Sequence, residues 1–215
     1  LLFVVSGLTL DFYKKRNWNF VLIIVLFLLF FLVKNPKHPS ITMVDVGQGD
    51  SILLQDAWNR KNILIDTGGR LRFRSDEQWK EGHYKSNAES TLLPYLRARG
   101  VSKLDVLIVT HPDEDHIGDL ETVSQKVPIK NIYVSARALE KKSFVEKLDN
   151  LKSKIHIVQE GDKLPIFNNY LRFLTTGMGE KSDNDNSLVT FGDFYGKKFL
   201  FTGDLEEEGE IQLQK

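Results

Sequence analysis

The chain contains no cysteine, and this absence removes two kinds of site from consideration. Neither a disulfide bond nor a metal site built from thiolates can form. The chain also lacks an excess of charge of either sign, because 29 basic residues balance 29 acidic ones. A neutral chain offers no global attraction for nucleic acid or for an anionic membrane, so such an interaction must depend on a local surface.

The first part of the chain is strongly apolar. The run from Phe20 to Val33, FVLIIVLFLLFFLV, contains no polar residue, whereas a soluble helix would show one every three or four positions. Its length is near the lower limit for crossing a bilayer. A buried core helix and a signal-peptide segment are the alternatives, but the pattern favours a transmembrane helix. We therefore expect membrane-spanning segments and a linker in residues 1–38 and a separate domain in residues 39–215.

Charged residues beside this run predict its orientation. Lys14, Lys15 and Arg16 precede it, and the positive-inside tendency places them in the cytoplasm. The domain would then lie on the extracytoplasmic side of a multi-pass cell-membrane protein, although Lys34 and Lys37 argue for the opposite orientation. The opening stretch LLFVVSGLTL looks like the end of an earlier span, so we expect the chain to be a fragment.

The domain reads as α/β. β-rich segments alternate with helical ones, which is typical of sheets covered by helices. Strands are expected at 41–46, 51–55, 62–66, 104–110, 129–135, 154–158, 170–175, 187–191 and 198–203. Helices are expected at 90–100, 117–126 and 138–152, and a long loop at 68–87.

The stretch THPDEDHIGD, residues 110–119, places two of the five histidines among carboxylates directly after an apolar strand. His111 and Asp113 can point into one pocket from the strand end, and Asp115 and His116 follow where the chain turns into a helix. Imidazole and carboxylate together suit Zn²⁺, Mn²⁺ or iron. A solvated polar turn is the alternative. Six residues cannot complete two coordination spheres, so further ligands must come from other strand ends.

Two later segments are candidates for these ligands. Asp204 ends the apolar strand FLFTGD, where a carboxylate could bridge two metals, although an ordinary helix N-cap is the alternative. The cluster SDNDNS, residues 182–187, could bring Asp185 or Asn186 to the site, although such clusters are more often turns.

Five motifs together resemble the metallo-β-lactamase superfamily, and in particular the C-terminal domain of ComEC-type competence proteins, the channels that bring DNA across the membrane during transformation. The motifs are TMVDVGQGDSILL, NILIDTGG, LIVTHPDEDHIGD, NDNSLVTF and KFLFTGD, in matching order between about residues 40 and 210. The resemblance implies an αββα sandwich, incomplete at its C-terminus and preceded by a transmembrane helix.

The resemblance also implies two divalent metal ions, Mn²⁺ or Zn²⁺. His111 and Asp113 would serve the first ion, Asp115 and His116 the second, and Asp204 would bridge them. Asp113 stands where the superfamily usually has histidine, which makes Mn²⁺ a serious competitor of Zn²⁺. The residues that would support and shape the pocket without ligation are Asp45, Gly47, Gln48, Gly49, Asp50, Asp66, Thr67, Gly68, Asn186 and Ser187.

Asn186 and Ser187 occupy the segment in which the superfamily has a further histidine ligand. The last metal-binding histidine of the superfamily follows the bridging carboxylate at a greater distance than this chain extends past Asp204. We expect either that the natural chain is longer or that the gene is truncated and its product inactive.

The function implied is a membrane-anchored, metal-dependent phosphodiesterase that cuts the DNA strand that does not enter the cell, with Asp115 as the catalytic residue. Its partners would be DNA, in the form of one strand of the incoming duplex, the membrane and other components of the competence DNA-uptake machinery. Arg70, Arg72 and Arg74 could contact the DNA backbone, with a solvated loop as the alternative. A non-catalytic domain that binds or gates DNA with a degenerate metal site is the second reading, and hydrolysis of a small ester or lactam is the third.

Overall fold

Two sheets form the frame of the domain in a computed structural model that describes residues 18–69, 86–175 and 184–213. The first sheet has six strands, β1 (Ser40–Met43), β2 (Ile52–Gln55), β3 (Asn62–Ile65), β4 (Leu104–Ile108), β5 (Ile129–Ser135) and β6 (Lys154–Val158), in that order. The second has the order β10-β9-β8-β7, from β7 (Lys163–Ile166), β8 (Asn169–Thr175), β9 (Leu188–Phe194) and β10 (Lys197–Phe201). The α/β fold predicted from the sequence is therefore present.

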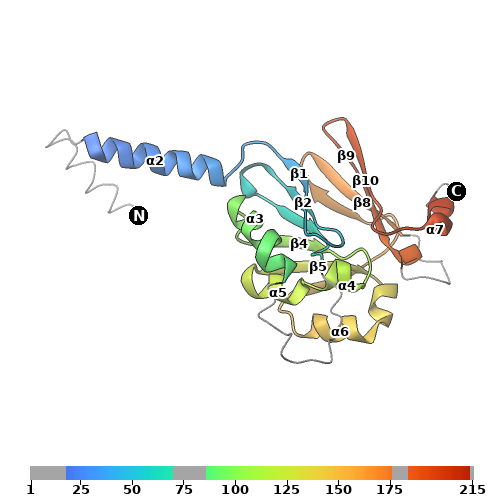
Figure 1. Ribbon diagram of the computed structural model, residues 1–215. Helices are drawn as coiled ribbons and strands as arrows, with labels where there is room; N and C mark the ends of the chain where they lie inside the picture. The colour runs from blue at the N-terminus through green and yellow to red at the C-terminus, as the bar shows by residue number, and fades with distance from the viewer. Residues whose placement is uncertain (1–17, 70–85, 176–183, 214–215) are drawn as a thin grey trace, which may run out of the picture.

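The helices of the described part lie mainly on one face of the first sheet (Figure 1). They are α3 (Leu93–Ala98), α4 (Glu114–Ile117), α5 (Leu120–Lys126) and α6 (Lys142–Asp149). Short turns of other helix types lie at η1 (Ala57–Asn59), η3 (Ala88–Leu92), η4 (Arg137–Glu140) and η5 (Asn184–Asn186). After the second sheet, the chain forms α7 (Glu207–Leu213), which packs against η5.

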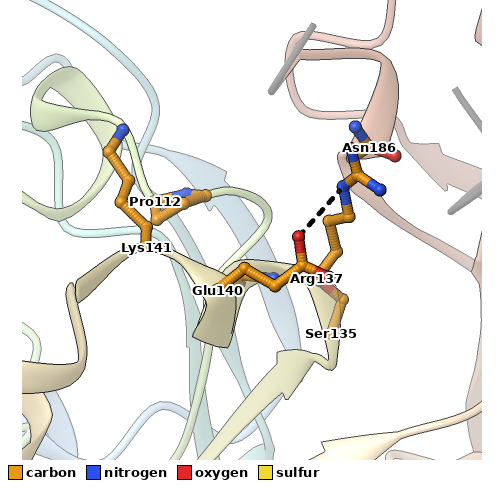
Figure 2. Close-up of a pocket in the computed structure, with 7 residues that line it drawn as sticks. Pro112, Ser135, Arg137, Glu140, Lys141 and Asn186 are labelled. Atoms are coloured by element: carbon orange, nitrogen blue, oxygen red, sulfur yellow. Dashed lines mark hydrogen bonds and ion pairs between the residues drawn. The ribbon is translucent and has the colours of Figure 1, made fainter. Parts of the chain in front are cut away.

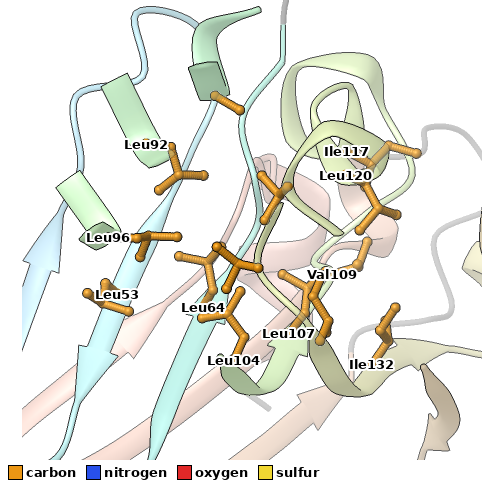
Figure 3. Packing of buried hydrophobic residues seen from close by; sticks show 14 of the residues in the cluster. Leu53, Leu64, Leu92, Leu96, Leu104, Leu107, Val109, Ile117, Leu120 and Ile132 are labelled. Carbon is orange, nitrogen blue, oxygen red and sulfur yellow. The ribbon is translucent and has the colours of Figure 1, made fainter. Parts of the chain in front are cut away.

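Alternation along the strands divides the core into two layers. On β2 and β3, Leu53 and Leu64 face the helices, where Figure 3 shows them beside Leu92 and Leu96. Their neighbours point to the other face and pack between the two sheets, together with residues such as Phe173 from β8. Because successive side chains of a strand point to opposite faces, the same short apolar segments supply both cores.

All three predicted helices have different bounds in the structure. The helix expected at 117–126 begins at Leu120 as α5, because Ile117 ends the separate helix α4. The helix expected from residue 90 begins two residues earlier, because the carboxylate of Asp119 accepts a hydrogen bond from the N–H of Ala88 at 2.6 Å. The helix expected at 138–152 is divided into η4 and α6. The hydroxyl oxygen of Ser135 accepts a hydrogen bond from the N–H of Ala138 at 3.1 Å, and this bond fixes the η4 turn as an element separate from α6.

The apolar run forms α2 (Trp18–Lys34), which projects from the domain (Figure 1). Its C-terminal end is bound to the domain, because Lys34 Nζ donates to the carbonyl of Arg97 at 2.6 Å and Asn59 Nδ2 donates to the carbonyl of Lys34 at 2.8 Å. In the part of the chain that the structure describes, no helix combines the length and the apolar character needed to cross a membrane.

Candidate metal centre

The carboxyl ends of parallel strands bring the candidate residues together. β3 and β4 run parallel, and the N–H of Asp66 continues their pairing by donating to the carbonyl of Ile108 at 2.9 Å. The second sheet joins at the same point, where the N–H of Leu188 donates to the carbonyl of Thr110 at 2.7 Å. Sites in sheets of this kind form beyond the carboxyl ends of the strands, and this arrangement follows that rule.

Three of the predicted ligands converge here. One ligand atom each of His111, His116 and Asp204 lie within 4.8 Å of one another. His116 Nε2 is 3.3 Å from Asp204 Oδ1, and the two imidazole rings have their centroids 4.0 Å apart. Both histidines are buried, and the Nε2 atom of each has no hydrogen-bond partner among the described residues. Buried polar atoms are normally satisfied, so two such atoms that face a carboxylate fit a metal ion.

Asp113 and Asp115 lie at the edge of this group. Asp113 Oδ2 is 3.8 Å from His111 Nε2, and Asp115 Oδ2 is 3.9 Å from His116 Nε2. Both carboxylates are partly exposed. Asp113 also binds Lys141, whose Nζ donates to Asp113 Oδ1 at 2.6 Å. Each aspartate therefore lies beside the histidine with which the sequence pairs it.

Asp66 holds the two histidine-bearing segments in place. Its carboxylate is fully buried and accepts from the N–H of Thr110 at 2.9 Å and from the Thr110 hydroxyl. Asp66 Oδ2 is 2.9 Å from His116 Nδ1. When Nδ1 carries the proton of this hydrogen bond, Nε2 is directed toward Asp204, which is the usual way in which an outer carboxylate orients a metal-binding histidine.

Burial and charge act differently on the two histidines. Burial alone would lower the pKa of His116, but the hydrogen bond and charge of Asp66, with Asp204 and Asp115 nearby, raise that pKa to about 9. Burial lowers the pKa of His111, and the adjacent His116 lowers it further. Burial also raises the pKa of the Asp50 carboxyl, with the charges of Asp66 and Asp204 acting in the same direction. Unequal pKa shifts within one cleft are typical of functional sites.

The other residues predicted to shape the pocket occupy several environments. Thr67 is buried and its hydroxyl donates to the carbonyl of His116 at 3.0 Å, while Gly68 is buried against Val46. Asn186 and Ser187 are buried, and Ser187 Oγ is 3.4 Å from His111 Nδ1. Asp45, Gly47, Gln48 and Gly49 are exposed in the loop between β1 and β2, where Asp45 Oδ1 accepts from the N–H of Gly47 at 3.1 Å. Arg70, Arg72 and Arg74 lie outside the described residues.

The sequence did not single out Lys141 or Asp119. Lys141 is an ordinary charged residue in a polar segment, and Asp119 is the last residue of the quoted motif, but the contact of each comes from a distant part of the chain. Thr110 belongs to the quoted motif, and its bond to Asp66 joins two motifs that were interpreted separately.

Gly49 leaves the space that the Asp115 backbone occupies. A Cβ atom at position 49 would lie 1.6 Å from the carbonyl oxygen of Asp115, and the φ angle of Gly49 is +70°. We expect Gly49→Ala to displace the Asp115 turn and to lower the free energy of unfolding by more than the about 1–2 kcal/mol of the left-handed conformation alone. Gly161→Ala is the matched control, because its φ is +87° and nothing lies within 4 Å. Chemical denaturation of both variants measures the difference, and equal losses would contradict the packing role of Gly49.

Two packed sheets with a histidine–aspartate cluster at the strand ends define a metallohydrolase-type domain. The chain belongs to the metallo-beta-lactamase superfamily, whose family profile matches residues 44–214. Membership indicates, in general terms, a metal-dependent hydrolase, and the donor set suits a divalent ion.

Relatives agree with the resemblance seen in the motifs. The chain is 35% identical over 194 residues to ComE operon protein 3 of Bacillus subtilis, covering 88% of this chain and 25% of that protein. It is 32% identical over 97 residues to competence protein ComA of Neisseria gonorrhoeae, covering 45% of this chain and 11% of that protein. The predicted relationship to competence proteins is thereby confirmed, for a chain that spans about a quarter or less of these relatives.

A solved metallo-beta-lactamase from Cronobacter sakazakii shares the fold. Its TM-score is 0.53 at 16% identity, with 81% of this chain and 65% of that chain covered. At this identity the likeness concerns the fold alone.

Proposed function

We propose that the domain is a metal-dependent phosphodiesterase that cleaves DNA during uptake. The observation that carries this proposal is the convergence of His111, His116 and Asp204, in which the Nε2 atoms of both buried imidazoles lack a hydrogen-bond partner among the described residues and that of His116 lies 3.3 Å from Asp204 Oδ1. The competence relatives favour DNA as the substrate over a small ester or lactam.

His111, His116 and Asp204 would hold two divalent ions, Mn²⁺ or Zn²⁺, with Asp113 and Asp115 completing the set. When bound, such ions supply a nucleophile at neutral pH and neutralise charge on the phosphoryl oxygens. Asp115 is 39% exposed while it borders the buried His116, so its carboxylate can reach both solvent and the site. We assign Asp115 the role of accepting the proton of the attacking water while the new P–O bond forms and the sugar oxygen leaves.

We further propose that the domain is anchored to the cell membrane by α2. Apolar side chains are exposed around this helix, among them Ile23, Phe27 and Phe30 at 60–62%. Its 17 residues cover about 26 Å at 1.5 Å per residue, somewhat less than the about 30 Å of a hydrocarbon core. The extracytoplasmic position depends on Lys14, Lys15 and Arg16, which lie outside the described residues. The partners would be one strand of the incoming duplex and other uptake components.

A second function is favoured by one contact. The 2.6 Å bond from Lys141 engages Asp113, the residue that departs from the superfamily pattern. If Lys141 remains bound to the Asp113 carboxylate, that carboxylate is not available to the first metal ion. The domain would then bind or gate DNA without cutting it.

Metal analysis and a cleavage assay on linear DNA distinguish the two functions. We expect the purified protein to bind metal and to cut DNA with Mn²⁺ or Zn²⁺. We expect Asp115→Asn to lose about 10²- to 10⁴-fold in rate, the usual contribution of a general base, and to lose at most part of the metal, because His111, His116 and Asp204 remain. Asp149→Asn, on the exposed face of α6, is the matched control. Stoichiometric metal with intact DNA would exclude the phosphodiesterase, whereas incomplete metal binding with intact DNA would support the gating domain.

A further inference from the structure

A polar cavity of about 270 Å³ is lined by residues that adjoin the candidate metal ligands in the chain (Figure 2). The residues that line it are Pro112, Ser135, Arg137, Ala138, Glu140, Lys141 and Asn186. Cavities for drug-sized ligands measure about 300–1,000 Å³. This one therefore suits a small polar group of a larger ligand and not an entire large ligand.

The walls of the cavity are continuous with the metal centre. Pro112 stands between the candidate ligands His111 and Asp113 in the chain, so one wall of the cavity adjoins both of them. On the opposite wall, Asn186 immediately precedes Ser187, whose Oγ is 3.4 Å from His111 Nδ1. A chain-like ligand with one group at the histidines would therefore place a neighbouring group in the cavity.

Two cations flank the opening from one short segment. Arg137 and Lys141 belong to η4 and the residue that follows it, and Figure 2 shows Arg137 rising toward Asn186 while Lys141 rises beside Pro112. The η4 turn is fixed by the bond from the N–H of Ala138 to Ser135 Oγ. Ser135 itself ends β5, so the two cations are positioned by the sheet and not by a free loop.

The carboxylate partners that the structure describes for the two cations are partly or well exposed. Arg137 Nε is 3.8 Å from Glu140 Oε2, and both side chains are well exposed, so this pair contributes little. Lys141 binds Asp113, a carboxylate that belongs to the metal centre, so Lys141 lies between that centre and the cavity. A guanidinium favours paired phosphate oxygens, and an ammonium supplies a point charge.

We propose that this cavity is a phosphate subsite, in which Arg137 and Lys141 hold the backbone phosphate next to the one at the metal centre on a single DNA strand. The proposal rests on the proposed action on DNA and adds the residues that position the strand. Arg137 and Lys141 are here positioning residues, since they act on a phosphate that does not react.

Salt-dependent binding of a fluorescein-labelled single-stranded oligodeoxynucleotide tests the subsite. Anisotropy is measured in EDTA, which prevents cleavage and removes any contribution of bound ions to phosphate binding. We expect Arg137→Gln to lower the affinity about fivefold. The slope of log K against log salt should fall in magnitude by about 0.7 in the double variant with Lys141→Gln, and by less in Arg137→Gln alone, because both cations neutralise the same phosphate and each neutralised phosphate of a single strand contributes about 0.7 to the slope.

Lys130→Gln and the double variant Lys130→Gln/Lys154→Gln are the matched controls. Both lysines are exposed at the amino ends of the parallel strands β5 and β6, whereas Ser135 beside the cavity is at the carboxyl end of β5, so their replacement removes the same charge from another surface. Thermal unfolding and metal content are measured for every variant, since Lys141 also contacts Asp113. Arg137→Gln leaves the contact between Lys141 and Asp113 in place. The test therefore depends on Arg137→Gln alone if Lys141→Gln alters the metal content.

The outcomes separate this proposal from the proposed function. If the protein cleaves DNA and the Arg137→Gln variant binds the oligonucleotide with the same affinity as the Lys130→Gln variant, only the subsite is overturned. Loss of affinity in a protein that never cleaves DNA supports the subsite and contradicts the phosphodiesterase. Binding to phosphatidylglycerol vesicles that requires Arg137, without binding to the oligonucleotide, overturns the subsite in favour of a lipid headgroup site.

Discussion

Replacement of Asp66 by alanine is expected to lower the free energy of unfolding by about 3 to 5 kcal/mol and to abolish stable metal binding. Asp66 is fully buried and binds both the backbone and the hydroxyl of Thr110, as well as His116 Nδ1. Its removal leaves buried donors without acceptors, and each such group costs about 1–3 kcal/mol. Its removal also breaks the hydrogen bond that orients the His116 ring and directs its Nε2 toward Asp204. Denaturant unfolding and metal analysis measure the two effects.

The pH dependence of this loss gives an independent readout. In metal-free protein the pKa of His116 is raised from 6.5 to about 9, with burial opposed by Asp66 and its neighbours. A raised folded-state pKa contributes stability that is complete below 6.5 and is lost as the pH rises through 9. The destabilisation by Asp66→Ala should therefore be larger below pH 6.5 than above pH 9. An equal loss at both extremes would contradict the ion pair with His116.

Asp105→Ala is the matched control for Asp66→Ala. Asp105 lies on β4, and its Oδ2 accepts from the N–H of Asn62 at 3.0 Å, while Lys103 pairs with it at 3.0 Å. It contacts neither candidate histidine, so its loss should cost about 1–3 kcal/mol and leave the metal content unchanged. If Asp66→Ala keeps its metal as Asp105→Ala does, Asp66 does not orient the site.

The local sequence pattern was sufficient to predict most strands, but it did not predict β7. β4 could be predicted because it is short, apolar and buried on both faces, and β5 because it is β-rich and alternates between buried and more exposed positions. β7 was not predicted, since KLPI is short and contains a proline. It forms at the edge of its sheet, where Pro165 interrupts no ladder on its outer side, and only pairing with β8 reveals it.

The candidate site divides in the same way. His111 and His116 could be identified because their motif is contiguous, and Asp204 because it ends a clear strand. The contact between Lys141 and Asp113 could not be predicted, because it depends on where the segment after β5 returns to the sheet. A lysine in a chain rich in lysine carries no local signal of such a contact.

His116→Ala is expected to lower the rate of DNA cleavage by about 10³-fold. His116 is the residue on which the group depends most, since its Nε2 lies 3.3 Å from Asp204 and its Nδ1 is bound to Asp66. A bound metal contributes several kcal/mol to the transition state, and each 1.4 kcal/mol is a factor of ten in rate. The metal content should fall together with the rate, which is measured on the same linear DNA.

His156→Ala is the matched control for this variant. His156 also lies in the domain, stacked on Tyr133 at 4.6 Å with Nε2 2.9 Å from Asn131 Oδ1, but it belongs to β6 and not to the cluster. Its loss should cost some stability and leave rate and metal unchanged. A His116→Ala protein that retains both the metal and the rate would remove the imidazole–carboxylate cluster as the centre of the reaction. The cleavage would then have to arise from residues outside the group that His116 forms with His111 and Asp204.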